Sequence, residues 1–331
     1  MPKIIAIASG DWHIHKFKAF NQNDSRLHYC LMAMKKIANV CSANKVPLLF
    51  TGDLVHSPKD IENETNTSIM STFRNYFQNR HTAMYGISGN HDLSEKNNLE
   101  HRSPTHLDIL SQFSYFHKMD YSDVLIGDGF QNRKKIMLWG IPYMNNDQDL
   151  RMQIKSFRKE LKRVDEFFNI LMVHSDIPGA KTPEGFELNE TEHLGDWDRL
   201  TRGWDLILAG HIHRPQKIGK KTYMLGPPLQ HTFGEEGIKC GYWEIYDDRT
   251  IKFRLIKGFP KFRTLEKGQV PDNKLDYFRD PNDALVDEQE EKQEFALNNS
   301  RKSLATAYCD VKNIRSKRKR RALIIVLNQV E

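Results

Sequence analysis

Cysteine is scarce in this chain, and its few cysteines are too far apart to form a local pair. The four residues, Cys30, Cys41, Cys240 and Cys309, include no CxxC spacing. This pattern argues against a disulfide framework and against a thiolate zinc site, and it fits a reducing compartment. We therefore expect a cytoplasmic protein without structural disulfides.

Long apolar runs are absent as well. No stretch approaches the roughly 18 consecutive apolar residues that cross a membrane. Met1-Pro2-Lys3 leads directly into an apolar segment, without the charged leader, apolar core and cleavage site of a secretory signal. We therefore expect no association with a membrane and no secretion.

Positive charge is concentrated in one segment. The net charge is +6, but residues 312–321 alone contain seven lysines and arginines and no acid. These seven charges exceed the net charge by one, so the rest of the chain has a net charge of −1, and the positive net charge does not indicate a basic face there. A solvated charge run is the ordinary interpretation of such a tail, and binding of phosphate groups is the functional alternative.

Apolar strands alternate with amphipathic helices along much of the 331 residues, which suffice for one large domain or two ordinary ones. Apolar spacing predicts helices around residues 27–41, 69–77 and 150–164. Strand–helix alternation predicts an α/β fold with a largely parallel sheet and crossover helices. Further strands, the last two joined as a hairpin, are predicted to form a second sheet packed on the first: residues 135–139, 222–225, 241–246 and 250–256.

The character of the chain changes after Phe262. Glycine and proline interrupt the segment that follows, residues 280–294 are strongly acidic, and an apolar end at 322–327 follows the basic run. We therefore divide the chain into a main domain of residues 1–262 and a C-terminal appendage of residues 263–331. The appendage is interpreted as a reduced cap or as a segment that docks on a partner.

Polar motifs follow five of the predicted strands directly. They are Asp11-Trp12-His13, Gly52-Asp53, Gly89-Asn90-His91-Asp92, His174 and Gly210-His211-Ile212-His213. Ligands of α/β sheets bind outside the carboxyl ends of the strands, so these side chains can meet in one place. Carboxylate, imidazole and amide groups together suit manganese, iron, zinc or magnesium. One carboxylate that bridges two ions holds them about 3.5–4 Å apart, and Asp53 is the candidate bridge.

The other histidines are expected to be surface or packing residues: His15, His28, His81, His101, His106, His117, His193 and His231. His56 and His15 are close enough to the motifs to line the same pocket, but we do not predict them to be ligands. Trp12 is expected to pack beside the site.

The motif series resembles the calcineurin-like metallophosphoesterase superfamily and, within it, the SbcD-type DNA repair exonuclease subunits of bacteria and phages. The narrower resemblance depends on three stretches, residues 210–216, 224–228 and 233–236, which are similar to the GHxH motif, the GSP-type turn and the phenylalanine–glutamate pair of SbcD-like chains. The resemblance covers about residues 3–262. Gly226-Pro227-Pro228 stands where the family usually has a serine, and only about 70 residues remain for a cap.

The resemblance implies a four-layer αββα sandwich and a DNA exonuclease with two divalent ions, with manganese expected and magnesium, iron or zinc as alternatives. It implies that one ion is held by Asp11, His13, Asp53 and His213. It implies that the other is held by Asp53, Asn90, His174 and His211. Phosphodiester hydrolysis by a hydroxide shared between the ions would follow. The implied partners are DNA, an SbcC-like ATPase and a second copy of the chain.

Two further roles are implied by the resemblance. His91 would stabilise the transition state or protonate the departing 3′ oxygen. Asp92 would orient His91 without contacting the ions.

A small-molecule phosphodiesterase, for example one acting on cyclic nucleotides, remains the alternative, because the shared site handles both kinds of ester. Substrate choice would then depend on loops such as residues 182–192. A protein serine/threonine phosphatase is disfavoured, since GNHD replaces the GNHE of that group and its GDxVDRG signature is missing around Asp53. A binding scaffold without catalysis would lack ligands, and every expected ligand is present.

Overall fold

A computed structural model describes residues 2–16, 25–57, 61–93, 104–126, 135–161, 167–191, 194–265 and 276–279. The chain divides into two compact units, Met1–Phe262 and Arg263–Glu331. The acidic stretch, the basic run and the apolar end lie outside the described residues, as do His101 and His193. A two-stranded sheet of β13 (Phe262–Thr264) and β14 (Tyr277–Arg279) begins where the first unit ends.

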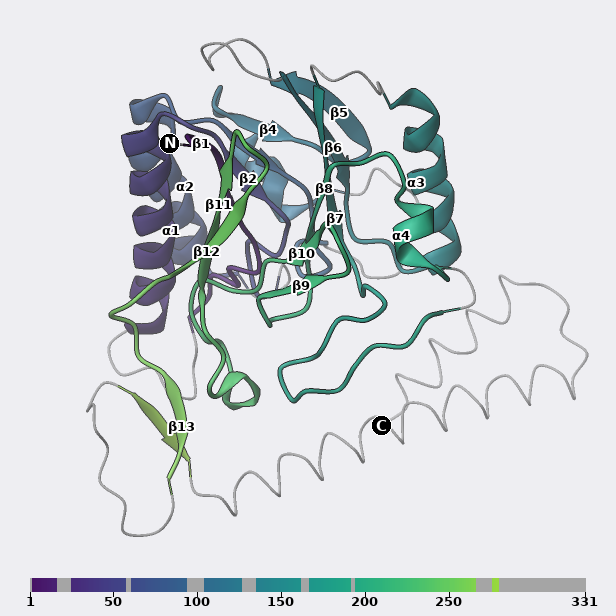
Figure 1. The fold of residues 1–331 in the computed structure, drawn as a ribbon. Coiled ribbons are helices and arrows are strands. Elements are labelled where there is room, and N and C mark those ends of the chain that lie inside the picture. The colour runs from purple at the N-terminus through teal and green to yellow at the C-terminus, as the bar shows by residue number, and fades with distance from the viewer. Residues whose placement is uncertain are drawn as a thin grey trace, which may run out of the picture. The chain divides into compact units, whose positions relative to one another are not determined.

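Six strands form the first sheet, in the order β12-β11-β1-β2-β3-β4. Their bounds are β1 (Ile4–Ser9), β2 (Leu48–Phe50), β3 (Met84–Gly86), β4 (Phe116–Lys118), β11 (Gly241–Tyr246) and β12 (Ile251–Leu255). The four strands β1 to β4 are parallel, whereas β11 runs antiparallel to both β1 and β12. Helices α1 (Ser25–Asn44) and α2 (Asn63–Tyr76) cover the outer face of this sheet (Figure 1).

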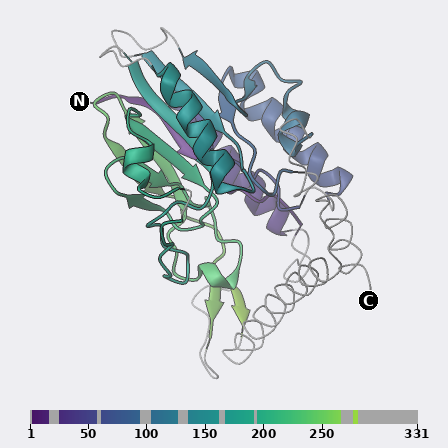
Figure 2. The same ribbon diagram turned by 90° about the vertical axis from the view of Figure 1, so that its right-hand side faces the viewer.

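Six more strands form the second sheet, in the order β5-β6-β7-β8-β10-β9. Their bounds are β5 (Ser122–Ile126), β6 (Lys135–Ile141), β7 (Phe167–His174), β8 (Leu206–Gly210), β9 (Gln216–Ile218) and β10 (Thr222–Met224). The central strands are parallel, and the two edge strands are antiparallel to their neighbours. Helix α3 (Asp147–Glu160) lies across the outer face, as Figure 2 shows, together with α4 (Trp197–Leu200).

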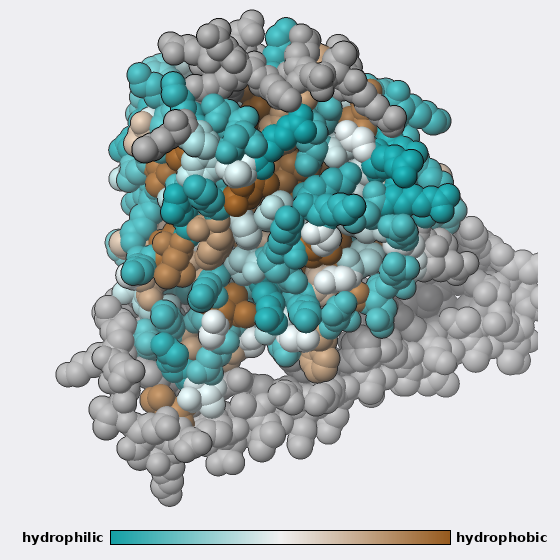
Figure 3. Space-filling view, in the orientation of Figure 1, coloured by the Kyte–Doolittle hydropathy of each residue, from teal (hydrophilic) through white to brown (hydrophobic). Residues whose placement is uncertain are grey.

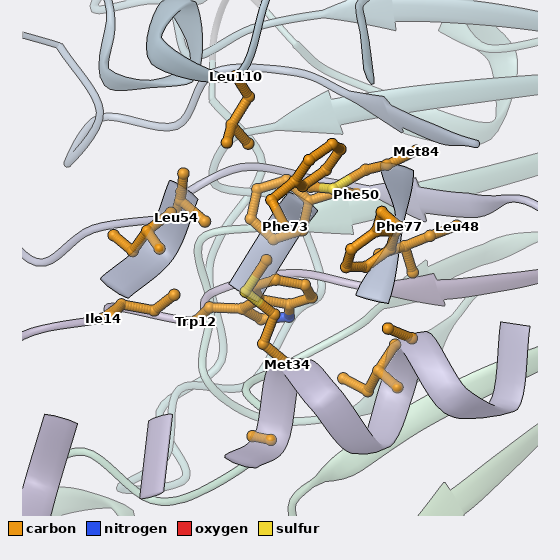
Figure 4. Packing of buried hydrophobic residues seen from close by; sticks show 14 of the residues in the cluster. Trp12, Ile14, Met34, Leu48, Phe50, Leu54, Phe73, Phe77, Met84 and Leu110 are labelled. Atoms are coloured by element: carbon orange, nitrogen blue, oxygen red, sulfur yellow. The ribbon is translucent and has the colours of Figure 1, made fainter. Parts of the chain in front are cut away.

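Three apolar layers hold these elements together. Between the sheets, side chains such as Ala8, Leu49 and Met172 are fully buried. Under α1 and α2, the rings of Trp12 and Phe50 pack edge to face, 4.8 Å apart (Figure 4). The third layer lies under α3 and α4. Because each amphipathic helix buries its apolar stripe on one sheet face, the four-layer αββα sandwich is confirmed.

The three helices predicted from apolar spacing are confirmed, although α3 ends at Glu160, earlier than the pattern up to Val164 indicates. Asn146 begins α3 as its cap, since its side chain accepts the backbone N–H of Gln148 at 2.8 Å. The described part of the chain also contains the short 3₁₀ helices η2 (Gln78–Arg80), η3 (His106–Leu110) and η4 (Phe233–Glu235).

One prediction about the sheets is wrong. The hairpin of β11 and β12 belongs to the first sheet and not to the second. The reason is the burial of β1, whose residues Ile5–Ser9 are all buried. A buried strand needs hydrogen-bond partners along both edges, and β2 occupies only one of them. Strand β11 pairs with the other edge, with Ala8 opposite Trp243.

Few large apolar side chains of the described residues are exposed. No helix among them combines the length and the apolar character needed to cross a bilayer. Figure 3 shows a face dominated by hydrophilic side chains, with apolar surface in separate groups. Among the residues that the structure describes, the most exposed large apolar one is Phe186, which is 74% exposed.

Candidate metal centre

The five polar motifs follow the carboxyl ends of five strands, and these strands belong to both sheets. Strands β1, β2 and β3 of the first sheet lead to the motifs of Asp11, Asp53 and Asn90. Strands β7 and β8 of the second sheet end at His174 and directly before His211. His174 crosses between the sheets, because its Nδ1 donates to the carbonyl oxygen of Thr51 over 2.6 Å. The site therefore lies where the carboxyl edges of the two sheets meet.

The backbone of this site is unusual. Asp11, His13, Asp53 and His211 have φ angles of 53°, 41°, 57° and 97°. Residues other than glycine rarely adopt positive φ, and such strain concentrates at functional sites. The turns support one another, because the N–H groups of Asp11 and His13 donate to the carbonyl oxygens of Gly52 and Asp53 at 2.9 and 3.0 Å.

Gly52 and Gly89 allow these turns to approach each other. Gly52 has a φ of 99°, and a Cβ atom there would lie 2.6 Å from the backbone nitrogen of Gly89. A Cβ on Gly89 would lie 2.2 Å from Oδ1 of Asp53. Both positions therefore exclude any side chain.

Three side chains form the first metal group: Asp11, His13 and His213. One ligand atom from each lies within 4.8 Å of the others. The Nε2 atoms of His13 and His213 are 3.0 Å apart, so both rings point to one position. Asp11 is fully buried and His13 is almost so.

Three further side chains form the second metal group: Asp53, His174 and His211. Their ligand atoms also lie within 4.8 Å of one another. The amide oxygen of Asn90 is 3.0 Å from Nε2 of His174 and 3.0 Å from Nδ1 of His211. Asn90 therefore lies beside this group, as the sequence predicts.

Asp53 belongs to the second group and also lies beside the first. Its Oδ2 atom is 3.4 Å from Nε2 of His13 and 3.3 Å from Nε2 of His174. A carboxylate that lies beside ligands of both groups has the position that a bridging ligand in a two-metal site requires. The structure thus brings together all seven predicted ligands.

The donor atoms fit divalent cations. Oδ2 of Asp11 and Nδ1 of His13 are buried and have no hydrogen-bond partner. Buried polar atoms without a partner are rare in folded proteins, and a cation would supply the missing partner for the Asp11 carboxylate. Oxygen and imidazole donors suit the borderline and hard divalent metals.

Acceptors behind two of the histidines set which ring nitrogen carries the hydrogen. Nδ1 of His213 lies 2.6 Å from Oε1 of Glu235, and Nδ1 of His174 lies 2.6 Å from the Thr51 carbonyl oxygen. Both Nδ1 atoms therefore donate, which leaves each Nε2 free to bind a cation. Partners of this kind fix the orientation of ligand histidines in metal sites.

The charges of the site are strongly coupled. Burial raises the pKa of Asp11 to about 6, although His213 opposes the change. Burial also opposes the charge of Asp53, but His174 outweighs it and lowers the pKa of Asp53 to about 2. Burial disfavours protonation of His174 and His213, but Asp53 and Glu235 outweigh it and raise each pKa to about 9. Cations binding here therefore displace protons.

His91 lies at the cavity, as predicted, but Asp92 has a different place from the expected one. Nδ1 of His91 donates to the carbonyl oxygen of His56, and its backbone N–H donates to Oδ1 of Asp53 at 2.8 Å. The Asp92 carboxylate instead accepts the N–H groups of Asp53 and Leu54, both at 2.8 Å. Asp92 thus holds the Asp53 turn, and the His56 carbonyl orients His91.

Most of the remaining histidines lie where the sequence predicts. His28, His81 and His117 are exposed, and His106 is half-buried. His231 packs in the interior, but it does so directly at the site, with its ring centre 5.1 Å from that of His13.

The expectation for the two histidines beside the motifs is half right. His56 lines the site cavity, whereas His15 lines a neighbouring cavity and stacks on His56 at 4.5 Å. Trp12 packs beside the site as expected, and its indole N–H donates to Ser9 Oγ at 2.8 Å.

Sequence reasoning missed several residues that support the site. Glu235 stands out in the sequence only as part of a family motif, and nothing in the local pattern distinguishes Arg26, which is 1% exposed. Tyr143 packs its ring 5.6 Å from that of His211. Asp176 places Oδ1 3.5 Å from Nε2 of the same histidine. One sequence signal could have indicated Tyr143 and Asp176, because each follows the carboxyl end of a strand, β6 and β7 respectively, by two residues.

A cavity of about 380 Å³ opens over both groups. It is lined by ligands including Asp53 and His213 and, at its rim, by Thr182, Pro183 and Glu184. These three residues belong to the rim turn, residues 181–187, which is closed by the 2.8 Å hydrogen bond from Thr182 N–H to the Phe186 carbonyl. The arrangement suits hydrolysis of a phosphoester held over two cations, with the rim turn beside the substrate.

Comparison with known proteins identifies a matching family and several distant relatives. Residues 6–215 match the family "Calcineurin-like phosphoesterase". Protein 244L of Invertebrate iridescent virus 6, named for a phosphoesterase, is 23% identical over 255 residues, which cover 73% of this chain and 78% of that protein. An uncharacterized protein of Acanthamoeba polyphaga mimivirus is 25% identical over 277 residues, 80% of this chain but 19% of that protein.

Other similarities are more distant. Protein 078R of Invertebrate iridescent virus 3, also named for a phosphoesterase, is 23% identical over 205 residues, 61% of this chain and 53% of that protein. This chain thus spans about half or less of the length of two of the three relatives. Among solved structures, a dimetal phosphatase from Danio rerio is 10% identical, with a TM-score of 0.46. The match covers 77% of this chain and 97% of that chain.

Proposed function

Because the chain belongs to the calcineurin-like phosphoesterase family, we propose that it is a DNA exonuclease of the SbcD type that depends on two divalent ions, manganese foremost. The observation that carries the two-metal part of the proposal is the position of Asp53, whose Oδ2 lies within 3.4 Å of a histidine from each metal group. A bridging carboxylate is typical of two-metal phosphoester sites.

Asp11, His13, Asp53 and His213 would hold one ion, and Asp53, Asn90, His174 and His211 would hold the other. Such ions, when bound, activate water and neutralise the charge that builds on the phosphoryl group. The chain keeps the ligands in place through its strained turns and through the partners of His174 and His213.

His91 is the candidate general acid. Its Nδ1 hydrogen is committed to the carbonyl oxygen of His56, so Nε2 is the atom left for the substrate. Once protonated at Nε2, the ring can donate that proton to the departing 3′ oxygen. Donation to a developing oxyanion is worth about 10²- to 10⁴-fold in rate. His91→Ala is therefore expected to slow hydrolysis while leaving metal binding unchanged.

The DNA part of the proposal is supported by the similarity of residues 210–216 and 233–236 to SbcD-type motifs. Glu235, from the second of these stretches, holds the predicted ligand His213, which gives this stretch a physical role at the site. An SbcC-like ATPase and a second copy of the chain are the partners that belong to this proposal.

A small-molecule phosphodiesterase is the second candidate, and one observation favours it. Among the described residues that line the cavity, none is a lysine or an arginine. DNA binding depends largely on neutralisation of phosphates by such side chains, although two bound cations supply positive charge that a count of residues omits.

The test is manganese-dependent hydrolysis of linear duplex DNA, labelled at one end, by the purified full chain and by its Asp53→Ala variant. Release of mononucleotides that requires manganese and is lost in the variant supports the proposal and reveals the polarity. Bis(p-nitrophenyl) phosphate is the matched substrate without a duplex. If the protein hydrolyses this ester but not DNA, even after an SbcC-like ATPase is added, the DNA role is refuted and the small-molecule alternative is favoured.

A further inference from the structure

Arg26 is a charged side chain that the fold removes almost completely from water. It lies in the first turn of α1 and is 1% exposed. Its Nη2 donates to the carbonyl oxygen of Gln230 and, over 2.8 Å, to Nδ1 of His231, which lies 205 residues later in the chain. Burying a charge is unfavourable unless hydrogen bonds replace the lost water. Only Nη2 has such partners, because the buried Nε and Nη1 have no hydrogen-bond partner among the described residues. The contacts that hold this buried charge are therefore those with Gln230 and His231.

The contact with Arg26 determines the hydrogen position on His231. A guanidinium group only donates, so Nδ1 of His231 must accept, and the ring hydrogen is left on Nε2. Nε2 lies 3.1 Å from the carbonyl oxygen of Asp11, to which it donates. That carbonyl belongs to a residue with a φ of 53°, at the start of the turn that carries His13. A fixed donor thus braces a disfavoured backbone conformation.

The segment that Arg26 holds also supports the opposite side of the first metal group. The backbone N–H of His231 donates to Oε2 of Glu235 at 2.7 Å. Oε1 of the same carboxylate accepts the Nδ1 hydrogen of His213 at 2.6 Å. We call residues 230–235 the bracing segment, because it reaches Asp11 through His231 and His213 through Glu235.

The second metal group is held by other parts of the chain. His174 donates to the carbonyl oxygen of Thr51, and His211 lies between Asn90 and Asp176. Gln230 links the bracing segment to the core instead, since its Oε1 accepts the backbone N–H of Phe262 at 2.9 Å. Disturbing the bracing segment should therefore act on one metal group and not on both.

We propose that Arg26 is a positioning residue that orients the first metal group through His231 and the bracing segment, an inference that rests on the two-metal function proposed above. The guanidinium selects the ring hydrogen of His231, and His231 then fixes the turn of Asp11 and His13. Arg26 touches neither the ions nor the substrate.

The test is titration of the full metal-free chain with manganese, by calorimetry and by electron paramagnetic resonance. The wild type is expected to bind two ions that form a coupled pair. In Arg26→Met, which keeps the length but has no donor, one ion should bind about 10- to 100-fold more weakly, as when partners behind a ligand are lost. The signal of an isolated ion should then precede that of the pair.

Two further variants separate positioning from general support of the fold. His231→Gln can still accept from Arg26 and donate to Asp11, so it should retain much of the affinity, whereas His231→Leu should behave like Arg26→Met. Ile37→Ala, at a fully buried position of the same helix, should lower the unfolding midpoint without selective loss of one ion.

The outcomes distinguish the two proposals. A wild type that does not bind two manganese ions overturns the proposed function and this inference with it. Two ions in the wild type and equally tight binding in Arg26→Met overturn the role of Arg26 alone. The role of Arg26 is also overturned if Arg26→Met and Ile37→Ala weaken both ions to the same extent.

Discussion

Replacement of Asp92 by asparagine tests how the Asp53 turn is held. The fully buried carboxylate of Asp92 accepts four backbone hydrogens in two pairs. Oδ2 accepts those of Asp53 and Gly89 at 2.8 and 2.9 Å. Oδ1 accepts those of Leu54 and Val55 at 2.8 and 3.4 Å. An asparagine has the same shape but must direct its NH₂ group at one of the pairs.

The magnitude follows from the donors that are left unpaired. The NH₂ group of the substituted asparagine would face the pair with the longer bond, so one good and one weak hydrogen bond would be lost. A buried donor without an acceptor costs about 1–3 kcal/mol, and we expect Asp92→Asn to lower the free energy of unfolding by about 2–4 kcal/mol. Burial and the nearby Asp53 raise the pKa of Asp92 to about 7, so the ionised carboxylate is disfavoured in the fold at neutral pH, and removal of its charge offsets part of this loss.

Urea unfolding of the metal-free protein measures this loss, and manganese titration measures its effect on the site. We expect both stability and metal affinity to fall, because the Asp53 turn carries the bridging carboxylate. If Asp92 only oriented His91, the variant would instead match His91→Ala, with normal stability, normal metal binding and slow turnover. An unfolding free energy within about 1 kcal/mol of the wild type would refute the reasoning, since that is less than one unpaired donor costs.

Three further predictions follow from the described residues. Phe186→Ala should lower kcat/KM on DNA about 5- to 160-fold, because stacking of a base on an aromatic ring is worth roughly 1–3 kcal/mol. Turnover of bis(p-nitrophenyl) phosphate should stay unchanged, and DNA turnover equal to that of the wild type would contradict the prediction. Removal of manganese held at about 100 times the Kd of each site should lower Tm by roughly 10–20 °C, since such binding adds about 2.7 kcal/mol for each of the two ions. Scanning calorimetry with and without chelator measures this shift. Burial raises the thiol pKa values of Cys30, Cys41 and Cys240, so iodoacetamide should modify these thiols at least roughly 100-fold faster in the unfolded chain than in the folded one. Peptide mass mapping measures the modification, and rapid labelling of the folded protein would show that the thiols are accessible.

The sequence predicts the helices and the cluster of ligands well, because both depend on local pattern. Each ligand motif directly follows an apolar run, and strand ends at one edge of a sheet necessarily lie near one another. Asp11 and His174 belong to different sheets, so this rule alone does not bring them together, and their assignment to one site depended on the order of the whole motif series.

The errors concern partners that are distant in the sequence. Periodicity shows that residues 241–255 form a hairpin, but it does not show which sheet has a free buried edge. The Asp92 carboxylate accepts hydrogen bonds from backbone N–H groups that lie 37–39 residues earlier in the sequence. The contact of Arg26 with His231 joins segments that carry no shared motif, so no local signal could reveal it.

The pairing of β1 with β11 has a consequence for the order of events during synthesis. Ile245 pairs with Ala6, so the free edge of β1 waits until nearly the whole first unit has been translated. At roughly 5–20 residues per second, that delay is about 10–50 seconds. Non-local pairing of this kind slows folding and leaves a strand edge open to wrong partners. His213 and Glu235 are also made late, so the first metal group is incomplete until most of the first unit has been translated.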